Sequence, residues 1–320
     1  SPSNVISFPN MKNLYSLMPK LIEQNIVARI YERLSLPPPI QTPIINQWLD
    51  LAQKCQDVTR EIVISIVGKY TLLKDAYHSI IASLSHSALF FDHKISINWV
   101  HSGHLDISCT ESDKNDYHEA WDMLRSSQGI VIPGGFDNRG TQGKILAIQY
   151  ARENNVPILG ICLGLQLMIV EFARNVLHLG DANSIEINAN TQNPVIIEMP
   201  EFNPLQKGGT MRLGLKKTIF STKQSHAYRL YETPDYIFER HRHRYEFNIN
   251  YKSKFEEAGM RFVGHDESGK RMEIIELSEK DHPYFVGVQY HPEFLSRPFS
   301  PAPLFKGLIK SSIDRSIAKN

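Results

Sequence analysis

Short apolar runs and longer amphipathic segments alternate along the middle of the chain. The apolar runs have the length of strands, whereas the segments between them place apolar side chains at helical spacing. This alternation is typical of a buried parallel sheet with helices on both faces. We expect strands in residues 61–68, 95–100, 129–135 and 157–161, and helices in residues 74–90, 117–125, 142–153 and 163–175.

The N-terminal region follows a different pattern. Residues 11–34 carry apolar side chains at helical spacing, which predicts one or two amphipathic helices, and a shorter helical pattern covers residues 48–54. Between them, the prolines of SLPPPIQTP favour a stiff extended spacer. We therefore expect two domains, residues 1–57 and residues 58–320.

The apolar pattern loosens beyond residue 183. Shorter apolar runs lie in residues 261–266, 271–277 and 284–290, and we expect this region to extend the sheet with antiparallel strands. A mobile loop is expected near residues 220–225. The predicted fold class is α/β, with a mostly parallel central sheet flanked by helices and with extra antiparallel strands.

Composition argues against several kinds of partner and location. The 320 residues include 35 Lys and Arg against 34 Asp and Glu, so a net charge of +1 gives no field that favours nucleic acid or an anionic membrane. The longest apolar stretch, residues 156–174, is broken by proline, glycine and glutamine, so we expect no membrane segment. We also expect no secretion signal. Cys55, Cys109 and Cys162 are scattered, which argues against a disulfide framework or a structural zinc site and favours the cytoplasm.

Cys162 stands between an expected strand and an expected helix, with Gly160 and Gly164 on either side. A strand that passes directly into a helix requires a tight turn, and such a turn projects the sulfur at the carboxyl edge of the sheet. The adjacent helix N-terminus stabilises a thiolate, so this cysteine has the setting of a nucleophile. The alternative is a small buried residue without a chemical role.

A base and an orienting carboxylate follow a later apolar run. His291 ends the run YFVGVQY, and Glu293 lies two residues further on, where it can accept a hydrogen bond from the imidazole. The alternative is a turn that satisfies its own side chains. Gly134 and Gly135 follow another expected strand, so their amides, together with the amide of Leu163, are candidate donors to a tetrahedral oxyanion.

Several motifs resemble known families. PGGF, GICLGLQ and HPEF resemble class I glutamine amidotransferases, whose fold is flavodoxin-like and whose Cys-His-Glu triad converts glutamine to glutamate and ammonia. VGKYTLLKDAYHSI, GTQGK, DANSIE, GGTMRLG and ERHRHRYEFN are similar to the glutaminase domain of CTP synthase, a ligase of pyrimidine biosynthesis. This resemblance covers about residues 60–310, and residues 1–56 resemble the last synthetase helices and linker of that enzyme.

The resemblance implies roles for individual residues. Cys162 is expected to be the nucleophile, His291 the general base and acid, and Glu293 its orienting partner, with Gly135 and Leu163 at the oxyanion hole. Arg244 suits the α-carboxylate of glutamine and Glu186 suits its α-ammonium; alone, the RHRHR run would indicate a solvated basic strand or a polyanion patch. The expected glutamine-binding residues are Gly134, Gly135, Phe136, Leu163, Gly164, Leu165, Gln166, Glu186 and Arg244.

The resemblance also implies cofactors and partners. The glutaminase step needs no metal or other cofactor, whereas the synthetase domain of the same polypeptide uses ATP, Mg and UTP, and GTP is an allosteric activator. No phosphate-binding GxxxxGK[ST] loop occurs in these residues, so the chain is expected to be the C-terminal portion of such an enzyme. L-glutamine is the expected substrate, and the full-length enzyme is expected to form homotetramers and filaments.

Two features leave alternatives open. Asp137 replaces the glycine that usually follows PGGF, and we expect it to alter regulation rather than the triad. The segment Tyr117–Trp121 is either a filament contact, as the resemblance implies, or a helix start with Trp121 packed inward. An amidotransferase domain that serves another acceptor is the remaining alternative.

Overall fold

A computed structural model of the chain describes most of its residues. The contacts divide the chain into two compact units, one of residues 1–60 with 92–94 and the other of the remaining residues. The predicted boundary after residue 57 stays a prediction. Asp137, Cys109 and part of the GGTMRLG motif lie outside the described residues. The structure describes residues 5–11, 13–37, 43–71, 73–106, 114–136, 138–200, 211–232 and 235–319.

The first unit is helical, as its apolar spacing predicts. Helices α1 (Leu17–Glu23) and α2 (Ile26–Arg33) occupy the first amphipathic segment, and α3 (Pro43–Asp57) extends the pattern around Trp48 in both directions. The Trp48 ring lies 6.2 Å from the ring of Tyr15, which precedes α1. Among the described residues of the chain, no helix combines the length and apolar character needed to cross a bilayer.

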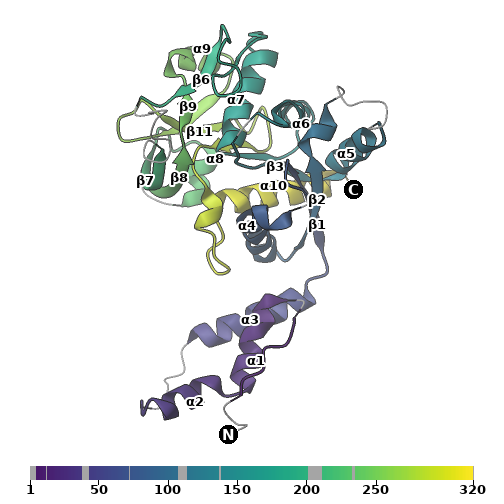
Figure 1. The fold of residues 1–320 in the computed structure, drawn as a ribbon, viewed down its shortest axis with the longest axis vertical. Coiled ribbons are helices and arrows are strands. Elements are labelled where there is room, and N and C mark those ends of the chain that lie inside the picture. Colours follow the sequence, from purple (N-terminus) through teal and green to yellow (C-terminus); the bar gives the residue numbers. More distant parts are fainter. Residues whose placement is uncertain are drawn as a thin grey trace. The chain divides into compact units, whose positions relative to one another are not determined.

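The second unit is built on a large mixed sheet (Figure 1). Its order is β2-β1-β3-β4-β12-β11-β10-β7-β8, and a smaller sheet of the order β5-β6-β9 accompanies it. The strands are β1 (Glu61–Gly68), β2 (Lys94–His101), β3 (Gly129–Ile132), β4 (Ile158–Ile161), β5 (Asn183–Ser184), β6 (Pro194–Glu198), β7 (Arg212–Phe220), β8 (Tyr236–His243), β9 (Tyr245–Phe247), β10 (Arg261–His265), β11 (Met272–Glu276) and β12 (Phe285–Val288).

Strand direction follows the prediction for most of the large sheet, whereas β5 and β6 of the smaller sheet pair in parallel. Strands β1, β3 and β4 pair in parallel, and β7, β8, β10 and β11 pair antiparallel with their neighbours. The prediction that the C-terminal runs are all antiparallel additions is wrong for β12, which lies between β4 and β11 and runs parallel to β4. An apolar run has the same period in either direction, so the sequence pattern did not reveal this insertion.

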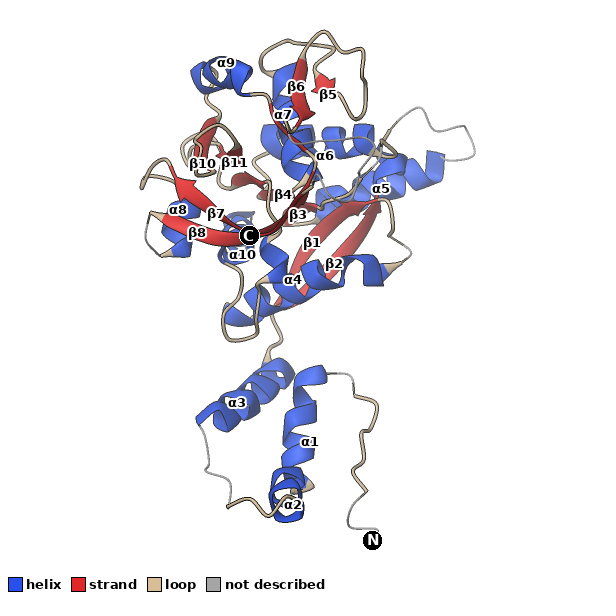
Figure 2. Cartoon of the chain, turned by 60° about the vertical axis from the view of Figure 1, so that its left-hand side comes forward, coloured by secondary structure: helices blue, strands red, loops and turns tan. Residues whose placement is uncertain are grey.

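Helices cover both faces of the large sheet (Figures 1 and 2). Ile130 and Ile132 of β3 belong to one buried cluster with α5, α6 and α7, whereas Val131 between them belongs to a second cluster with α4 and α10. The sequence analysis predicted no helix for residues 303–319, which form α10. The helices of this unit are α4 (His78–Phe90), α5 (Lys114–Ser126), α6 (Thr141–Glu153), α7 (Leu163–Asn175), α8 (His226–Tyr231), α9 (Lys252–Glu257) and α10 (Pro303–Lys319).

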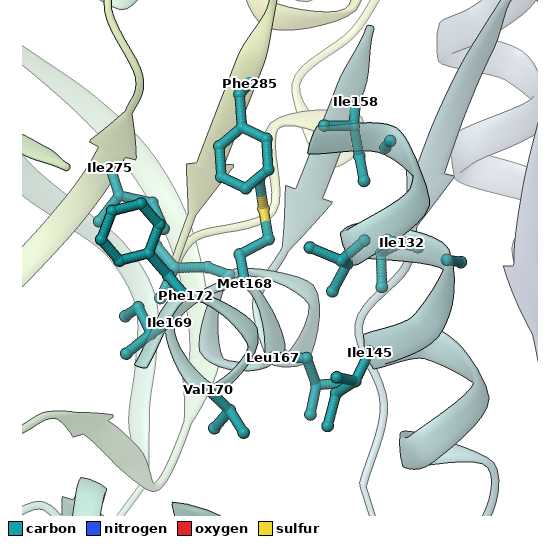
Figure 3. Close-up of a cluster of buried hydrophobic side chains, with 14 of the residues drawn as sticks. Ile132, Ile145, Ile158, Leu167, Met168, Ile169, Val170, Phe172, Ile275 and Phe285 are labelled. Atoms are coloured by element: carbon teal, nitrogen blue, oxygen red, sulfur yellow. The ribbon is translucent and has the colours of Figure 1, made fainter. Parts of the chain in front are cut away.

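Helix α7 is the centre of the first cluster. Met168 and Phe172 of α7 pack toward Phe285 of β12 and Ile275 of β11, and Leu167 faces Ile145 of α6 (Figure 3). Residues on every side of this helix are buried, which explains its continuous apolar sequence.

Gly164 sets how closely α7 approaches the sheet. A Cβ at this position would lie 2.2 Å from the backbone oxygen of Ile132 in β3. Any larger residue would force the helix away from the strand, so the packing of α7 on β3 requires glycine at position 164.

Gly164→Ala tests this close packing. We expect the substitution to lower the free energy of unfolding by about 2 kcal/mol or more, because the new methyl group meets a backbone atom that moves only with its strand. Gly180→Ala is the matched control, since a Cβ there meets nothing within 4 Å; its effect should stay below about 0.5 kcal/mol. Urea denaturation followed by circular dichroism measures both, and equal stability of the two variants would contradict the packing argument.

Candidate active site

The carboxyl ends of the parallel strands meet at one edge of the sheet and enclose a cavity. Pro133–Phe136 follow β3, Cys162 follows β4 and His291 lies three residues after the end of β12. Open α/β sheets place ligands at this edge. The cavity has a volume of about 290 Å³ and is lined by Tyr70, Ala76, Tyr77, Ser79, Ile80, Pro133, Gly134, Gly135, Phe136, Cys162, Arg242, His291, Glu293 and Phe294.

Cys162 has a strained backbone at the start of α7. Its φ of 54° and ψ of −102° lie outside the ordinary regions for a residue with a side chain, as in a nucleophile elbow. Its amide donates to the carbonyl of Val288 at 2.7 Å, which ties the turn to β12. A Cβ at Gly160 would lie 2.3 Å from the sulfur of Met168 and 2.9 Å from the carbonyl carbon of Gly164. The predicted tight turn between two close-packed glycines is therefore present.

The side chain of Cys162 is buried and polar groups surround it. Its sulfur lies 3.8 Å from the carbonyl oxygen of Arg242 and 3.7 Å from the side-chain nitrogen of Gln289. The first backbone hydrogen bond of α7 runs from Gln166 to Cys162. The amides of residues 163–165 precede that bond, so the positive end of the helix faces the sulfur.

His291 and Glu293 form a buried pair beside this sulfur. The Nδ1 atom of His291 lies 2.7 Å from Oε1 of Glu293, and the imidazole stacks on Phe294 with ring centroids 5.0 Å apart. Burial favours the neutral imidazole, but hydrogen bonds with Cys162 and Glu293 outweigh it and raise the pKa of His291 to about 10. Since Nδ1 bonds the carboxylate, Nε2 is the nitrogen available to the sulfur and to a substrate.

Gly134 lies against both the imidazole of His291 and the side chain of Cys162. A Cβ on Gly134 would lie 2.9 Å from Cε1 of His291 and 3.4 Å from Cβ of Cys162. Any side chain at this position would displace one of the two groups. The glycine pair that the sequence analysis assigned to oxyanion stabilisation thus also makes room for the two reacting groups.

Two of the other predicted residues flank the cavity. Phe136 lines it, and the guanidinium groups of Arg242 and Arg244 lie 5.7 and 5.6 Å from the centre of its ring. Gln166 is buried behind Cys162, where its side-chain nitrogen donates to the carbonyl of Tyr245 and to Gln289. Leu163, Gly164 and Leu165 are buried in the first turn of α7.

Glu186 and Arg244 are not among the residues that line the cavity within the described part of the chain. Glu186 follows β5, and Arg244 connects β8 to β9. Both act on the phenol of Tyr245: burial and Glu186 raise its pKa, and Arg244 opposes them. The predicted carboxylate and guanidinium therefore both act on Tyr245, and the guanidinium also lies over the ring of Phe136.

Sequence reasoning missed several cavity residues. Tyr70 and Tyr77 line the cavity, and the hydroxyl of Tyr77 accepts hydrogen bonds from the amides of Lys69 and Tyr70. These tyrosines lie in the motif VGKYTLLKDAYHSI, so the resemblance of this motif to the family could have indicated them as cavity residues. Arg242 lines the cavity from the exposed face of β8, whereas His241 and His243 on the opposite face are buried. Alternation along a strand therefore separates the arginines of RHRHR from its histidines, and Arg242 is the arginine that lines the cavity.

Comparison with known proteins identifies the same family as the sequence motifs do. The family model Glutamine amidotransferase class-I matches residues 72–311. CTP synthase 1 of Homo sapiens is 47% identical over 315 residues, 98% of this chain and 53% of that protein, and CTP synthase of Drosophila melanogaster is 49% identical over 317 residues, 98% and 50%. The chain thus spans about half the length of these relatives. Among solved structures, the Trypanosoma brucei CTPS glutaminase domain with bound acivicin is 33% identical, with a TM-score of 0.71 over 79% of this chain and 94% of that one.

Glu293→Gln tests the electrostatic pairing in the cavity. The carboxylate stabilises the imidazolium, so its removal should lower the pKa of His291 from about 10 toward the ordinary histidine range. Nitrogen NMR of histidine-labelled protein across pH 6 to about pH 11 measures this pKa, with the signal assigned from a His291→Asn sample. Glu279→Gln removes a carboxylate that pairs with Arg229 instead and should leave the His291 titration unchanged. An unaltered titration in Glu293→Gln would contradict the pairing.

Proposed function

Because the chain belongs to the class I glutamine amidotransferases, and among them to the glutaminase domains of CTP synthases, we propose that it hydrolyses L-glutamine with Cys162 as nucleophile. One observation carries the assignment of residues. The imidazole of His291 is hydrogen-bonded to Glu293 at 2.7 Å and lines the same cavity as the Cys162 side chain. Nucleophile, base and orienting carboxylate in one buried cavity are the parts that acyl transfer requires.

The first half of the reaction forms a thioester. The thiolate of Cys162 attacks the side-chain amide carbon of glutamine, and a bond between sulfur and carbon forms while the carbonyl oxygen gains negative charge. The amides of Gly135 and Leu163 donate to that oxygen. The imidazolium of His291 then gives its proton to the nitrogen, the bond between carbon and nitrogen breaks, and ammonia leaves.

The second half releases glutamate. Neutral His291 takes a proton from a water molecule, and the resulting hydroxide attacks the thioester carbon. The bond to sulfur breaks, glutamate is freed, and the thiolate and imidazolium are restored together. Glu293 keeps the imidazole oriented through both halves because its hydrogen bond to Nδ1 does not depend on which group Nε2 faces.

The α-carboxylate and α-ammonium of glutamine are assigned to Arg244 and Glu186. A forked guanidinium binds a carboxylate in two places, and a carboxylate pairs with an ammonium. Phe136 lines the cavity with the proposed triad, and the guanidinium of Arg244 lies 5.6 Å from the centre of its ring, which supports a binding mode in which the substrate extends past this ring. Backbone groups of Gly134 and the first turn of α7, which includes Gln166, complete the proposed site.

The acceptor of the ammonia is inferred from the longer relatives. In CTP synthases this acceptor is UTP, which ATP and Mg activate in a synthetase domain of the same polypeptide, and GTP is an allosteric activator. We propose the same use here, in a cytoplasmic homotetramer. The identity to CTP synthases over nearly the whole chain supports this acceptor over another amidotransferase pathway.

The additional filament role stays a prediction. His118 of α5 is exposed, while the Trp121 indole donates to the carbonyl of Leu105 and packs edge-on against Tyr150. The inward packing of Trp121 is thus accounted for within the domain, and the filament contact rests on the resemblance of the segment.

Cys162→Ala tests the proposed function. We expect glutamate release, measured with and without GTP, to fall by at least about 1,000-fold, because both halves of the reaction need the sulfur. Cys55→Ala is the control and should release glutamate at the parental rate, since Cys55 lies in the first unit. A diazo-ketone analogue of glutamine should add once, on Cys162, as read by mass spectrometry. Modification at another residue, or undiminished activity of Cys162→Ala, would refute the assignment.

A further inference from the structure

We propose that Lys144 is a positioning residue for glutamine hydrolysis, which holds the glycine loop Pro133–Phe136 in place from inside the protein and balances the negative charge that develops beside it. The inference rests on the proposed function, because it assigns a role to that loop in the reaction. Lys144 lies on α6, outside the motifs that carry the triad.

The first argument is the contact that Lys144 makes. Its side-chain nitrogen donates to the carbonyl oxygen of Pro133 at 3.3 Å, and the residue is only 3% exposed. A peptide unit is planar and trans, so a carbonyl held on one side directs the amide of the next residue to the other. Lys144 therefore fixes the direction of the Gly134 amide.

The second argument is that the loop is held at both ends in the same way. The side-chain nitrogen of Lys69, which follows β1, donates to the carbonyl oxygen of Phe136. Gly134 and Gly135 lie between the two anchored carbonyls and have no side chains to hold them. Two ammonium groups from different elements thus restrict the segment that supplies a proposed oxyanion donor.

The charges around Lys144 also connect it to the site. Burial, as the largest cause, and the ammonium of Lys69 lower the pKa of Lys144 to about 7, although the thiolate of Cys162 acts in the opposite direction. Other titratable groups that line the cavity include His291, Glu293 and Tyr77. A buried ammonium needs a compensating charge, and Cys162, where negative charge passes from sulfur to oxygen in the proposed reaction, favours the ammonium of Lys144.

If Lys144 served only to fill space in the core, an apolar side chain of similar size could replace it. The neighbours of Lys144 on α6 include Ile145 and Ile148, which are buried in the first cluster. Methionine has a similar length and suits such surroundings, so a change to methionine preserves packing while it removes both the charge and the hydrogen bond. The comparison between lysine and methionine therefore separates positioning from stability.

The test compares Lys144→Met with Lys144→Arg in the full chain by steady-state glutaminase kinetics. We expect Lys144→Met to lower kcat by about 10- to 100-fold, as removal of a supporting group around a reactive centre does, with KM for glutamine changed less than about 3-fold. Lys144→Arg keeps a charged donor. Its log kcat should lie at least about a third of the way from the value of Lys144→Met back to the parental value. Ile148→Val, a packing change on the same helix, should keep the parental kcat.

Other results would overturn the proposal. A parental kcat in Lys144→Met, or a loss that appears in KM alone, would show that the ammonium does not act on the transition state. If Lys144→Met does not fold, Lys144→Gln tests the charge alone, because it keeps a donor and removes the charge; a parental kcat there would refute the charge balance. The proposed function fails separately, when the parental chain neither releases glutamate nor forms the adduct on Cys162.

Discussion

The parallel register of β4 and β12 is the constraint on which the site depends. Ile161 stands opposite Val288, and the amide of Cys162 donates to the carbonyl of that same valine. The turn at Cys162, the proposed nucleophile, therefore begins at the level where β12 ends, and β12 leads to His291, the proposed base. A shift of one residue would turn alternate side chains to the other face and separate sulfur from imidazole.

Burial then determines the chemistry at this edge. Water is largely excluded from the thiol, the imidazole and the carboxylate, so each charge depends on a protein partner. His291 stays protonated because two opposite charges outweigh its desolvation. The glycine loop lies on the same side, anchored by ammonium groups at its carbonyls. Backbone orientation in this loop thus contributes to the electrostatic preorganisation of the proposed active site, together with the proposed triad.

Local pattern explains what the sequence predicted well. The elements between residues 61 and 175 follow from apolar period, and Cys162, His291 and Glu293 stand out because each follows a strand end. What the sequence did not reveal depends on contacts between distant elements. The parallel direction of β12, the cover provided by α10, and the position of Arg244 over the ring of Phe136 arise from tertiary packing, which no local period encodes.

The place of β12 in the sheet has a consequence for biosynthesis. The nucleophile is made early, on β4, but the strand that delivers the base is inserted beside it only after β11 has been synthesised. Until then β4 lacks one neighbour, and the sulfur at its end has no imidazole to share a proton with. A ribosome-bound chain that ends before residue 291 lacks this imidazole, so the proposed hydrolysis of glutamine requires that synthesis of the domain has passed its last strand.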